Sequence, residues 1–358
     1  MTATPKQRVL VRTAELVAFV AVPLIVVVAT LSVYSEQGRL ALDFHNELYP
    51  QAELVRHGEH AFDSPAAYLQ DRRNLVWPIA AVLPVVPLTV LGPDVADWVA
   101  ALFAIATLFA ALFALDVRDW RIYGVTLLWP SVIDTYQTAN ASLPIALLIA
   151  LMWRFRARAG IAGLALGYAI AVKFFVWPIA LWLFAIGKRT AAVVAAAVAA
   201  ASVVLMIPFT DLSDYVDLIQ KLRREFEHDV YTPFALLTDL GVPDGAARAA
   251  TAVLGVAVLA LAWRRRSLGL AIAAALVLSP IVWRHFFVLL VVPLGLSRPR
   301  FDAVWLIPIG LWVGDGTFNG APWQTAFVLA LVALTFTLCE LRPQPVATKS
   351  RDLSPAPA

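Results

Sequence analysis

The sequence is poor in cysteine and in charged residues. Cys339 is the only cysteine among 358 residues, so the chain has neither a disulfide framework nor a cysteine metal site. Asp, Glu, Lys and Arg together make up 15% of the residues, and 61% are hydrophobic. A soluble domain carries about 25% charged residues and about 45–50% apolar ones. The composition therefore predicts an integral membrane protein, and a net charge of only +3 does not favour nucleic acid as a partner.

Long apolar runs recur along the chain. A helix needs about 20 apolar residues, with a range of about 17–25, to span a bilayer. Runs near this length lie at residues 14–33, 95–115, 190–209, 247–263, 268–283 and 323–340. Shorter runs, several of them interrupted by proline, lie at residues 76–91, 122–133, 141–153, 160–172, 174–186, 285–296 and 301–314. We expect an all-α polytopic protein with about ten to thirteen transmembrane helices, some of them broken around a cavity.

Short basic clusters alternate with polar gaps between these runs. The clusters lie at residues 6–12, 118–121, 154–158, 188–189, 264–266 and 298–300. Cytoplasmic loops of membrane proteins are enriched in Lys and Arg, so we expect a cytoplasmic N-terminus and a multi-pass protein of the plasma membrane. The first run lacks a clear cleavage site and is predicted to stay as a helix. Between residues 75 and 116 two apolar runs connect an external loop to a cytoplasmic cluster, although such a connection requires an odd number of crossings. Either the run 76–91 is re-entrant or interfacial, or one of the two loops is assigned to the wrong side.

The chain reads as one transmembrane domain over residues 1–340. Two long external loops are expected, at residues 34–75 and 208–246, with a helix near 212–229 in the second. Residues 190–205 are almost all Ala and Val, which suits close packing between helices. Residues 341–358 are rich in proline and charge and are predicted to form a disordered cytoplasmic tail.

The first external loop carries the first candidate site. Asp43 follows the first apolar run and stands beside His45, Glu47 and Tyr49. A carboxylate among aromatic residues just outside a membrane helix can have a raised pKa and act as a base. The alternative is an ordinary solvated acid or a helix N-cap.

Three basic residues interrupt later apolar runs. Lys173 has apolar sequence on both sides, and an ammonium group at membrane depth costs about 2.5–3.5 kcal/mol on insertion scales. It therefore requires an anionic partner, such as a carboxylate or a bound phosphate, unless it reaches the interface as a snorkelling side chain. Arg284 and His285 lie between two apolar runs, where the guanidinium suits a phosphate and the imidazole suits hydrogen bonding or proton transfer. An ordinary interfacial loop is the alternative for this pair.

A polar break at residues 130–144 contains Asp134, Tyr136, Gln137 and Asn140. These side chains suit the wall of a binding site, although a plain turn with helix caps is an equal interpretation. The sequence has no Walker loop, dinucleotide-binding glycine motif, zinc-ligand spacing or nucleophile elbow. It therefore predicts no bound cofactor and no metal site built from such a motif.

A series of short motifs resembles a known family. They are Asp43-Phe44 with Tyr49 and Ala52, His57-Gly58 with Phe62-Asp63, the run 77–88 from Trp-Pro to Pro-Leu, the segment Tyr136–Asn140, Lys173 with Pro178, and Ser279-Pro280 with Trp283 and His285. Their order over residues 14–330 resembles the polyprenol-phosphate-sugar-dependent glycosyltransferases of the GT-C fold. The likeness is strongest to glycosyltransferase family 87, the mannosyltransferase-like group common in actinobacteria.

The resemblance implies an activity and roles for the candidate residues. A sugar, with mannose as the first expectation, would pass with inversion from a polyprenyl phosphate to a hydroxyl of a glycolipid or cell-envelope glycan on the external face. Asp43 matches the base of such enzymes. Lys173, Arg284 and His285 would bind the donor phosphate, and His45, Glu47, Tyr49, Gln137 and Asn140 would line the substrate site. Protein cations suffice to neutralise a monophosphate leaving group, so a divalent metal is compatible with the reaction but not required.

Two other classes share some of these features. A transporter or a flippase for lipid-linked sugars also has many spans, broken helices and a buried lysine, but it would usually show repeated halves. A structural membrane protein would not account for Lys173, because ionisable residues within membrane spans are usually functional.

Overall fold

The computed structural model describes residues 5–62, 75–316 and 318–341, and the expected tail at 342–358 lies outside them. Every regular element within these ranges is a helix, so the predicted all-α class is confirmed. Among the described residues, five helices are long and apolar enough to cross a membrane: Lys6–Glu36, Pro93–Ala114 (α6), Arg189–Met206 (α12), Asp244–Arg265 (α15) and Pro322–Glu340 (α18). The chain is therefore a polytopic helical membrane protein, and five of the six long runs identified in the sequence form these helices.

Shorter apolar helices complete the apolar body. They are Ser142–Arg154 (α9), Ala159–Val172 (α10), Phe174–Ala185 (η4 and α11), Leu268–Leu278 (α16), Arg284–Ser297 (η5 and α17) and Ala303–Val313 (η6). The expectation of a full-length helix over 268–283 was wrong, because α16 stops at Leu278. Ser279 precedes Pro280, and a residue before proline is disfavoured in the α conformation. The break leads the chain into the 3₁₀ segment η5, which carries Arg284 and His285.

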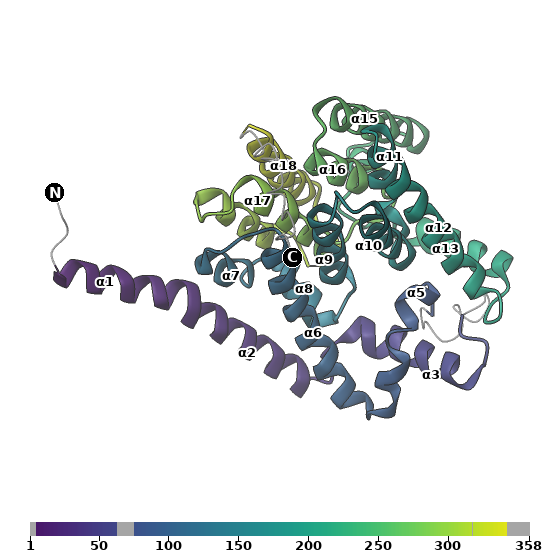
Figure 1. The fold of residues 1–358 in the computed structure, drawn as a ribbon, viewed down its shortest axis with the longest axis horizontal. Coiled ribbons are helices and arrows are strands. Elements are labelled where there is room, and N and C mark those ends of the chain that lie inside the picture. The colour runs from purple at the N-terminus through teal and green to yellow at the C-terminus, as the bar shows by residue number, and fades with distance from the viewer. Residues whose placement is uncertain (1–4, 63–74, 317, 342–358) are drawn as a thin grey trace, which may run out of the picture.

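The first helix is longer than the apolar run that predicts it. It is continuous through three segments: α1 (Pro5–Leu16), the π-helical η1 (Val17–Ala21) and α2 (Val22–Glu36). It extends away from the remaining helices, and the N-terminus lies at its far end (Figure 1). Its η1 segment approaches α7 (Trp120–Thr126), where a Cβ on Gly124 would lie 1.8 Å from the Phe19 carbonyl oxygen. Only glycine at position 124 permits this approach.

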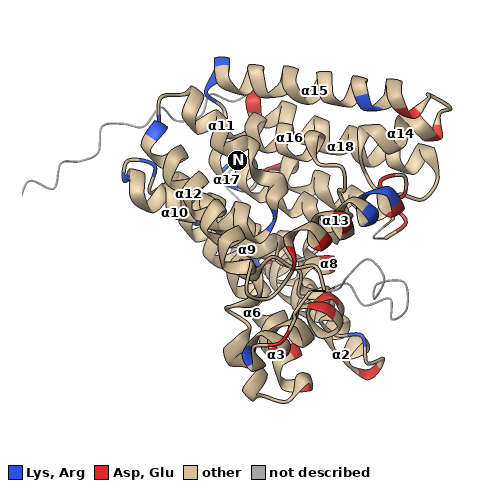
Figure 2. Cartoon of the chain, turned by 90° about the vertical axis from the view of Figure 1, so that its right-hand side faces the viewer, with Lys and Arg blue, Asp and Glu red and all other residues tan. Residues whose placement is uncertain are grey.

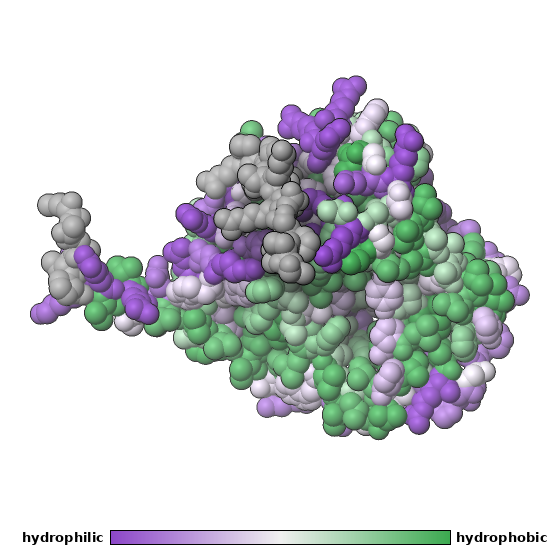
Figure 3. Space-filling view, viewed as in Figure 1, coloured by the Kyte–Doolittle hydropathy of each residue, from purple (hydrophilic) through white to green (hydrophobic). Residues whose placement is uncertain are grey.

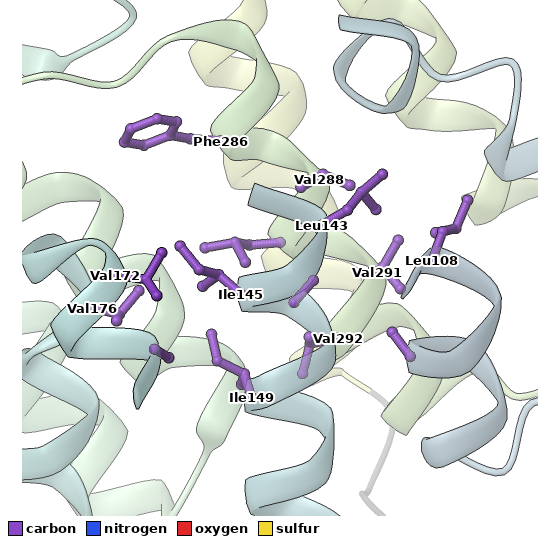
Figure 4. Packing of buried hydrophobic residues seen from close by; sticks show 14 of the residues in the cluster. Leu108, Leu143, Ile145, Ile149, Val172, Val176, Phe286, Val288, Val291 and Val292 are labelled. Carbon is purple, nitrogen blue, oxygen red and sulfur yellow. The ribbon is translucent and has the colours of Figure 1, made fainter. Parts of the chain in front are cut away.

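The centre of the apolar body is built around α9. Leu143, Ile145 and Ile149 of this helix are fully buried. They lie between Val172 and Val176 on one side and Val288, Val291 and Val292 of η5 and α17 on the other (Figure 4). This packing connects the C-terminal end of α10, which precedes Lys173, to η5, which carries Arg284 and His285.

Helices α10 and α12 pack closely through small residues. A Cβ on Gly163 would lie 2.6 Å from Val194 Cβ, and one on Gly167 would lie 2.7 Å from the Ala195 carbonyl oxygen. Glycines four residues apart allow two helix backbones to approach one another within a membrane. The expectation that residues 190–205 serve close packing is confirmed, and the contact holds α10 in place up to Lys173.

The remaining helices are short and surround the polar segments. They are η2 (Phe44–Leu48), α3 (Tyr49–His57), α5 (Ile79–Val82), η3 (Val86–Val90), α8 (Pro130–Thr138), α13 (Leu212–Phe226) and α14 (Pro233–Asp239). The expected helix near 212–229 is thus confirmed as α13. The run 76–91 forms only the short segments α5 and η3, which are too short to span a bilayer.

Charged residues lie mainly at helix ends and in loops. Lys and Arg gather at the ends of α10, α11, α12 and α15, whereas acidic residues are concentrated near α3, α13 and α14 (Figure 2). Hydrophobic residues cover much of the face seen in Figure 3, with hydrophilic groups toward its edges. Such a surface suits contact with lipid acyl chains over the helices and with water at their ends.

Candidate active site

Asp43 is held in place by a tight turn after the first helix. Ala41 adopts a left-handed conformation with φ of 55°, and its N–H donates to the Gln137 carbonyl oxygen at 2.7 Å. A non-glycine residue with positive φ is uncommon and concentrates at functional sites. The turn brings Asp43, which precedes the π-helical η2, to the C-terminal end of α8.

Asn140 faces Asp43 from the end of α8. Ala139 ends that helix in a second left-handed conformation, with φ of 51°, and turns the chain toward Asp43. The Asn140 amide donates through Nδ2 to Asp43 Oδ2 at 2.7 Å. Its Oδ1 accepts from Lys173 Nζ at 2.8 Å and from Ser142 Oγ at 2.9 Å. The donors at Oδ1 fix the orientation of the amide, so that Nδ2 points at the carboxylate.

Lys173 itself has an extended backbone conformation and separates α10 from η4. Its Nζ is 4.3 Å from the centroid of the Phe286 ring and 5.0 Å from that of Trp77. Aromatic faces stabilise a cation by about 0.5–2 kcal/mol, depending on desolvation. The Trp77 Nε1–H donates to Glu47 Oε2 at 2.8 Å, which ties Glu47 to the same group. Carboxylate, amide, ammonium and aromatic rings from five distant segments therefore form one site.

The charge state of Asp43 depends on its surroundings. Burial raises the pKa of the Asp43 carboxyl above its ordinary value, while the Asn140 hydrogen bond and the positive charge of Lys173 act in the opposite direction. A carboxylate with a raised pKa is a better proton acceptor than an ordinary aspartate. Asp43 therefore has the setting of a general base.

His285 and Arg284 stand side by side in η5 and differ in their partners. His285 is 4% exposed, and its Nε2 has no hydrogen-bond partner among the described residues. Its ring lies tilted against the Phe286 ring, with the two centroids 5.0 Å apart. Arg284 instead forms a two-pronged ion pair with Asp134 of α8, at 2.7 Å from Nε and 2.8 Å from Nη2. Nη1 donates to the Gly314 carbonyl oxygen at 3.3 Å.

We expect Arg284→Met to destabilise the protein strongly. The Arg284 and Asp134 side chains are 8% and 11% exposed, so the substitution leaves a carboxylate buried without its partner. Such a loss costs about 3–5 kcal/mol. The measurement is thermal unfolding of detergent-purified protein. Arg118→Gln is the control, because its pair with Asp116 is exposed and worth about 1 kcal/mol or less. Equal melting temperatures for the two variants would contradict the prediction.

Three of the predicted substrate-lining residues make contacts away from the Asp43 carboxylate. His45 Nδ1 lies 2.8 Å from Asp97 Oδ2 of α6. The Tyr49 hydroxyl donates to the Leu91 carbonyl oxygen at 2.8 Å and is buried. The Gln137 carbonyl oxygen accepts from Ala41, as described above. These residues hold the loop around Asp43, whereas Glu47 and Asn140 lie within the site itself.

Sequence reasoning did not assign site roles to Trp77 and Phe286, and it expected Asp134 to line a binding site rather than to pair with Arg284. Trp77 was noted only as part of a motif, and Phe286 follows His285 without a signal of its own. Each contacts a residue more than 80 positions away, so periodicity and spacing along the chain carry no sign of the contact. No group of three or more His, Cys, Asp or Glu suited to a metal ion occurs in the part of the chain that the structure describes.

The fold and the site define a class of protein: a polytopic membrane enzyme in which a carboxylate and an ammonium group are joined through one amide. A family model described as glycosyltransferase family 87 matches residues 75–293, more than half of the chain. The chain belongs to this family and is a glycosyltransferase, as its motifs predict. The matched segment contains Asn140, Lys173, Arg284 and His285, and Asp43 precedes it. No curated protein and no solved structure gives a match.

Proposed function

We propose that the protein transfers a sugar, mannose first among the candidates, from a polyprenyl phosphate to a hydroxyl group of a glycolipid or cell-envelope glycan. The reaction proceeds with inversion in a GT-C-type fold on the external face of the plasma membrane. One observation carries the proposal: Asp43 and Lys173 are linked through the two ends of the Asn140 amide. A transferase of this kind needs a base for the acceptor and a cation for the leaving phosphate, and these two residues supply them.

In this mechanism Asp43 accepts the proton of the acceptor hydroxyl. The hydroxyl oxygen attacks the anomeric carbon from the face opposite the phosphate, and the bond between that carbon and the phosphate oxygen breaks. Lys173 offsets the charge that develops on the departing phosphate. We propose that His285 hydrogen-bonds the same phosphate through Nε2, which is buried and has no hydrogen-bond partner among the described residues. Arg284 adds positive charge nearby, while its pair with Asp134 holds η5 in position.

The membrane setting supports a lipid-linked donor. An apolar cavity of about 290 Å³ lies between α5, α10 and α12 and is lined by Ile79, Tyr168 and Ala171 among others. Ala171 is two residues from Lys173 and Ile79 two residues from Trp77. In this proposal the N-terminus is cytoplasmic, on the same side as the basic clusters at residues 154–158 and 188–189. The family match does not favour a transporter or flippase without transferase activity.

The donor class can be tested with purified protein in liposomes. Liposomes are supplied with envelope lipids as acceptor and with either labelled polyprenyl-phosphate mannose or a labelled nucleotide-linked mannose. We expect label to reach a lipid glycan only from the polyprenyl donor, with an inverted anomeric configuration. Mass spectrometry of envelope glycans from a deletion strain should show one glycan shortened by that sugar. Transfer from the nucleotide sugar alone would refute the proposed donor.

A further inference from the structure

A continuous row of aromatic rings leads away from Lys173. Phe286, which contacts the ammonium group, stacks on Phe175 with ring centroids 4.6 Å apart. On its other side Phe286 meets Trp283 edge-on at 6.0 Å, and Trp283 meets Phe226 of α13 at 6.0 Å. Phe226 stacks on Phe318 with centroids 6.5 Å apart. Four segments thus contribute to one line of rings.

The rings become more exposed with distance from the site. Phe286 is 5% exposed, Trp283 and Phe226 are half-buried, and Phe318 is 50% exposed. We call Trp283, Phe226 and Phe318 the aromatic shelf. It begins beside Phe286, which contacts Lys173, and ends at the surface.

Polar groups accompany the aromatic shelf. The Trp283 Nε1–H has no hydrogen-bond partner among the described residues, although the nitrogen itself is shielded from solvent. The Asp315 carboxylate is exposed, three residues before Phe318. The exposed carboxylate offers acceptors for hydroxyl groups near Phe318.

The backbone that presents Phe318 is anchored on both sides. The Tyr231 hydroxyl donates to the Gly316 carbonyl oxygen at 3.2 Å. The Asn319 Nδ2 donates to the His228 carbonyl oxygen at 3.1 Å. Anchoring lowers the entropic cost of binding, because the ring is already held in place before a ligand arrives.

We propose that the aromatic shelf binds the carbohydrate part of the acceptor. The apolar C–H face of a sugar ring packs on the aromatic rings, while its hydroxyl groups bond to the exposed Asp315 carboxylate. The inference rests on the proposed function, because it places the acceptor relative to Asp43 and Lys173. Membrane anchoring by interfacial aromatics is the competing role. If the rings only anchor the protein, their substitution should leave the half-saturating amount of acceptor unchanged.

The test is Phe318→Ala in the full-length protein in liposomes, with polyprenyl-phosphate mannose as donor. The acceptor is a dilution series of envelope lipid extract from the deletion strain. Loss of one aromatic contact should raise the half-saturating amount of extract about three- to tenfold, while the half-saturating donor concentration stays the same.

Trp323→Ala is the matched control, because Trp323 is 64% exposed and lies outside the row. Equal half-saturating amounts of extract for Phe318→Ala and Trp323→Ala would overturn the aromatic shelf as a binding site. An increase in the half-saturating donor concentration alone would overturn the proposal too. Absence of any transfer by the wild-type protein would instead refute the proposed function, which separates that failure from the failure of the shelf.

Discussion

Replacing Asp43 by asparagine should lower the turnover number by about 10²–10⁴-fold. The amide has the shape of the carboxylate, and its oxygen can still accept the bond from Asn140 Nδ2, so the turn at Ala41 and the fold should persist. It cannot accept a proton from the acceptor hydroxyl. The measurement is sugar transfer by purified protein in liposomes, together with a check that the variant elutes as a single species.

Asp211→Asn is the control for this loss. Asp211 is an exposed acid that caps α13 by accepting from the Ser213 N–H at 2.8 Å, and asparagine caps a helix equally well. It should retain activity. Because burial raises the pKa of Asp43, wild-type activity should fall on acidification at a pH above the ordinary aspartate pKa of about 3.9. This fall in activity at low pH should be absent from any residual activity of Asp43→Asn. Normal turnover by this variant would remove Asp43 from the mechanism.

Lys173→Gln should lower the turnover number by about 10²–10³-fold, the usual cost of removing one preorganised group that stabilises developing charge. Glutamine can still bond to Asn140 Oδ1, but it places no positive charge between Trp77 and Phe286. Inhibition by free polyprenyl phosphate should weaken in parallel, because that product carries the phosphate the lysine would bind. Transfer rates and product inhibition measured in liposomes test both effects.

Lys173→Gln should also move the acid limb of the pH profile to higher pH. The positive charge of Lys173 lowers the pKa of Asp43, and its removal leaves burial less opposed. Lys188→Gln, at an exposed lysine before α12, should change neither turnover nor the limb. An unchanged pH profile in Lys173→Gln would show that the two groups do not interact in the active enzyme.

Sequence patterns predicted the long helices well, because a run of about 20 apolar residues has few alternatives to spanning a bilayer. They predicted α16 too long, since hydropathy does not register the break at Ser279-Pro280. Family motifs correctly identified the glycosyltransferase, and Asp43, Lys173 and Asn140 were all singled out. Their assembly was beyond sequence reasoning, because it depends on left-handed turns at Ala41 and Ala139, and alanine is not a residue that marks such turns.

Sequence patterns do not indicate that Arg284 has a carboxylate partner. Asp134 lies 150 positions earlier, and an arginine poised for a phosphate and one paired with an aspartate look the same in a single sequence. The structure separates the two cations: Lys173 is held by an amide oxygen and two aromatic rings, whereas Arg284 already has a carboxylate. Lys173 is therefore the group better placed to exchange partners when an anionic donor arrives.

The close approach at Gly124 has a further consequence for the base. The first helix meets α7 there, and the turn that follows the helix is bonded to Gln137 of α8. Asp43 is thus tied to the same short stretch of chain that carries Asn140. If the long first helix tilts to match a thinner or thicker bilayer, the Asp43 carboxylate and the Asn140 amide should keep their positions relative to one another. The tilt would move both groups together, so the hydrogen bond from Asn140 to Asp43 should not depend on bilayer thickness.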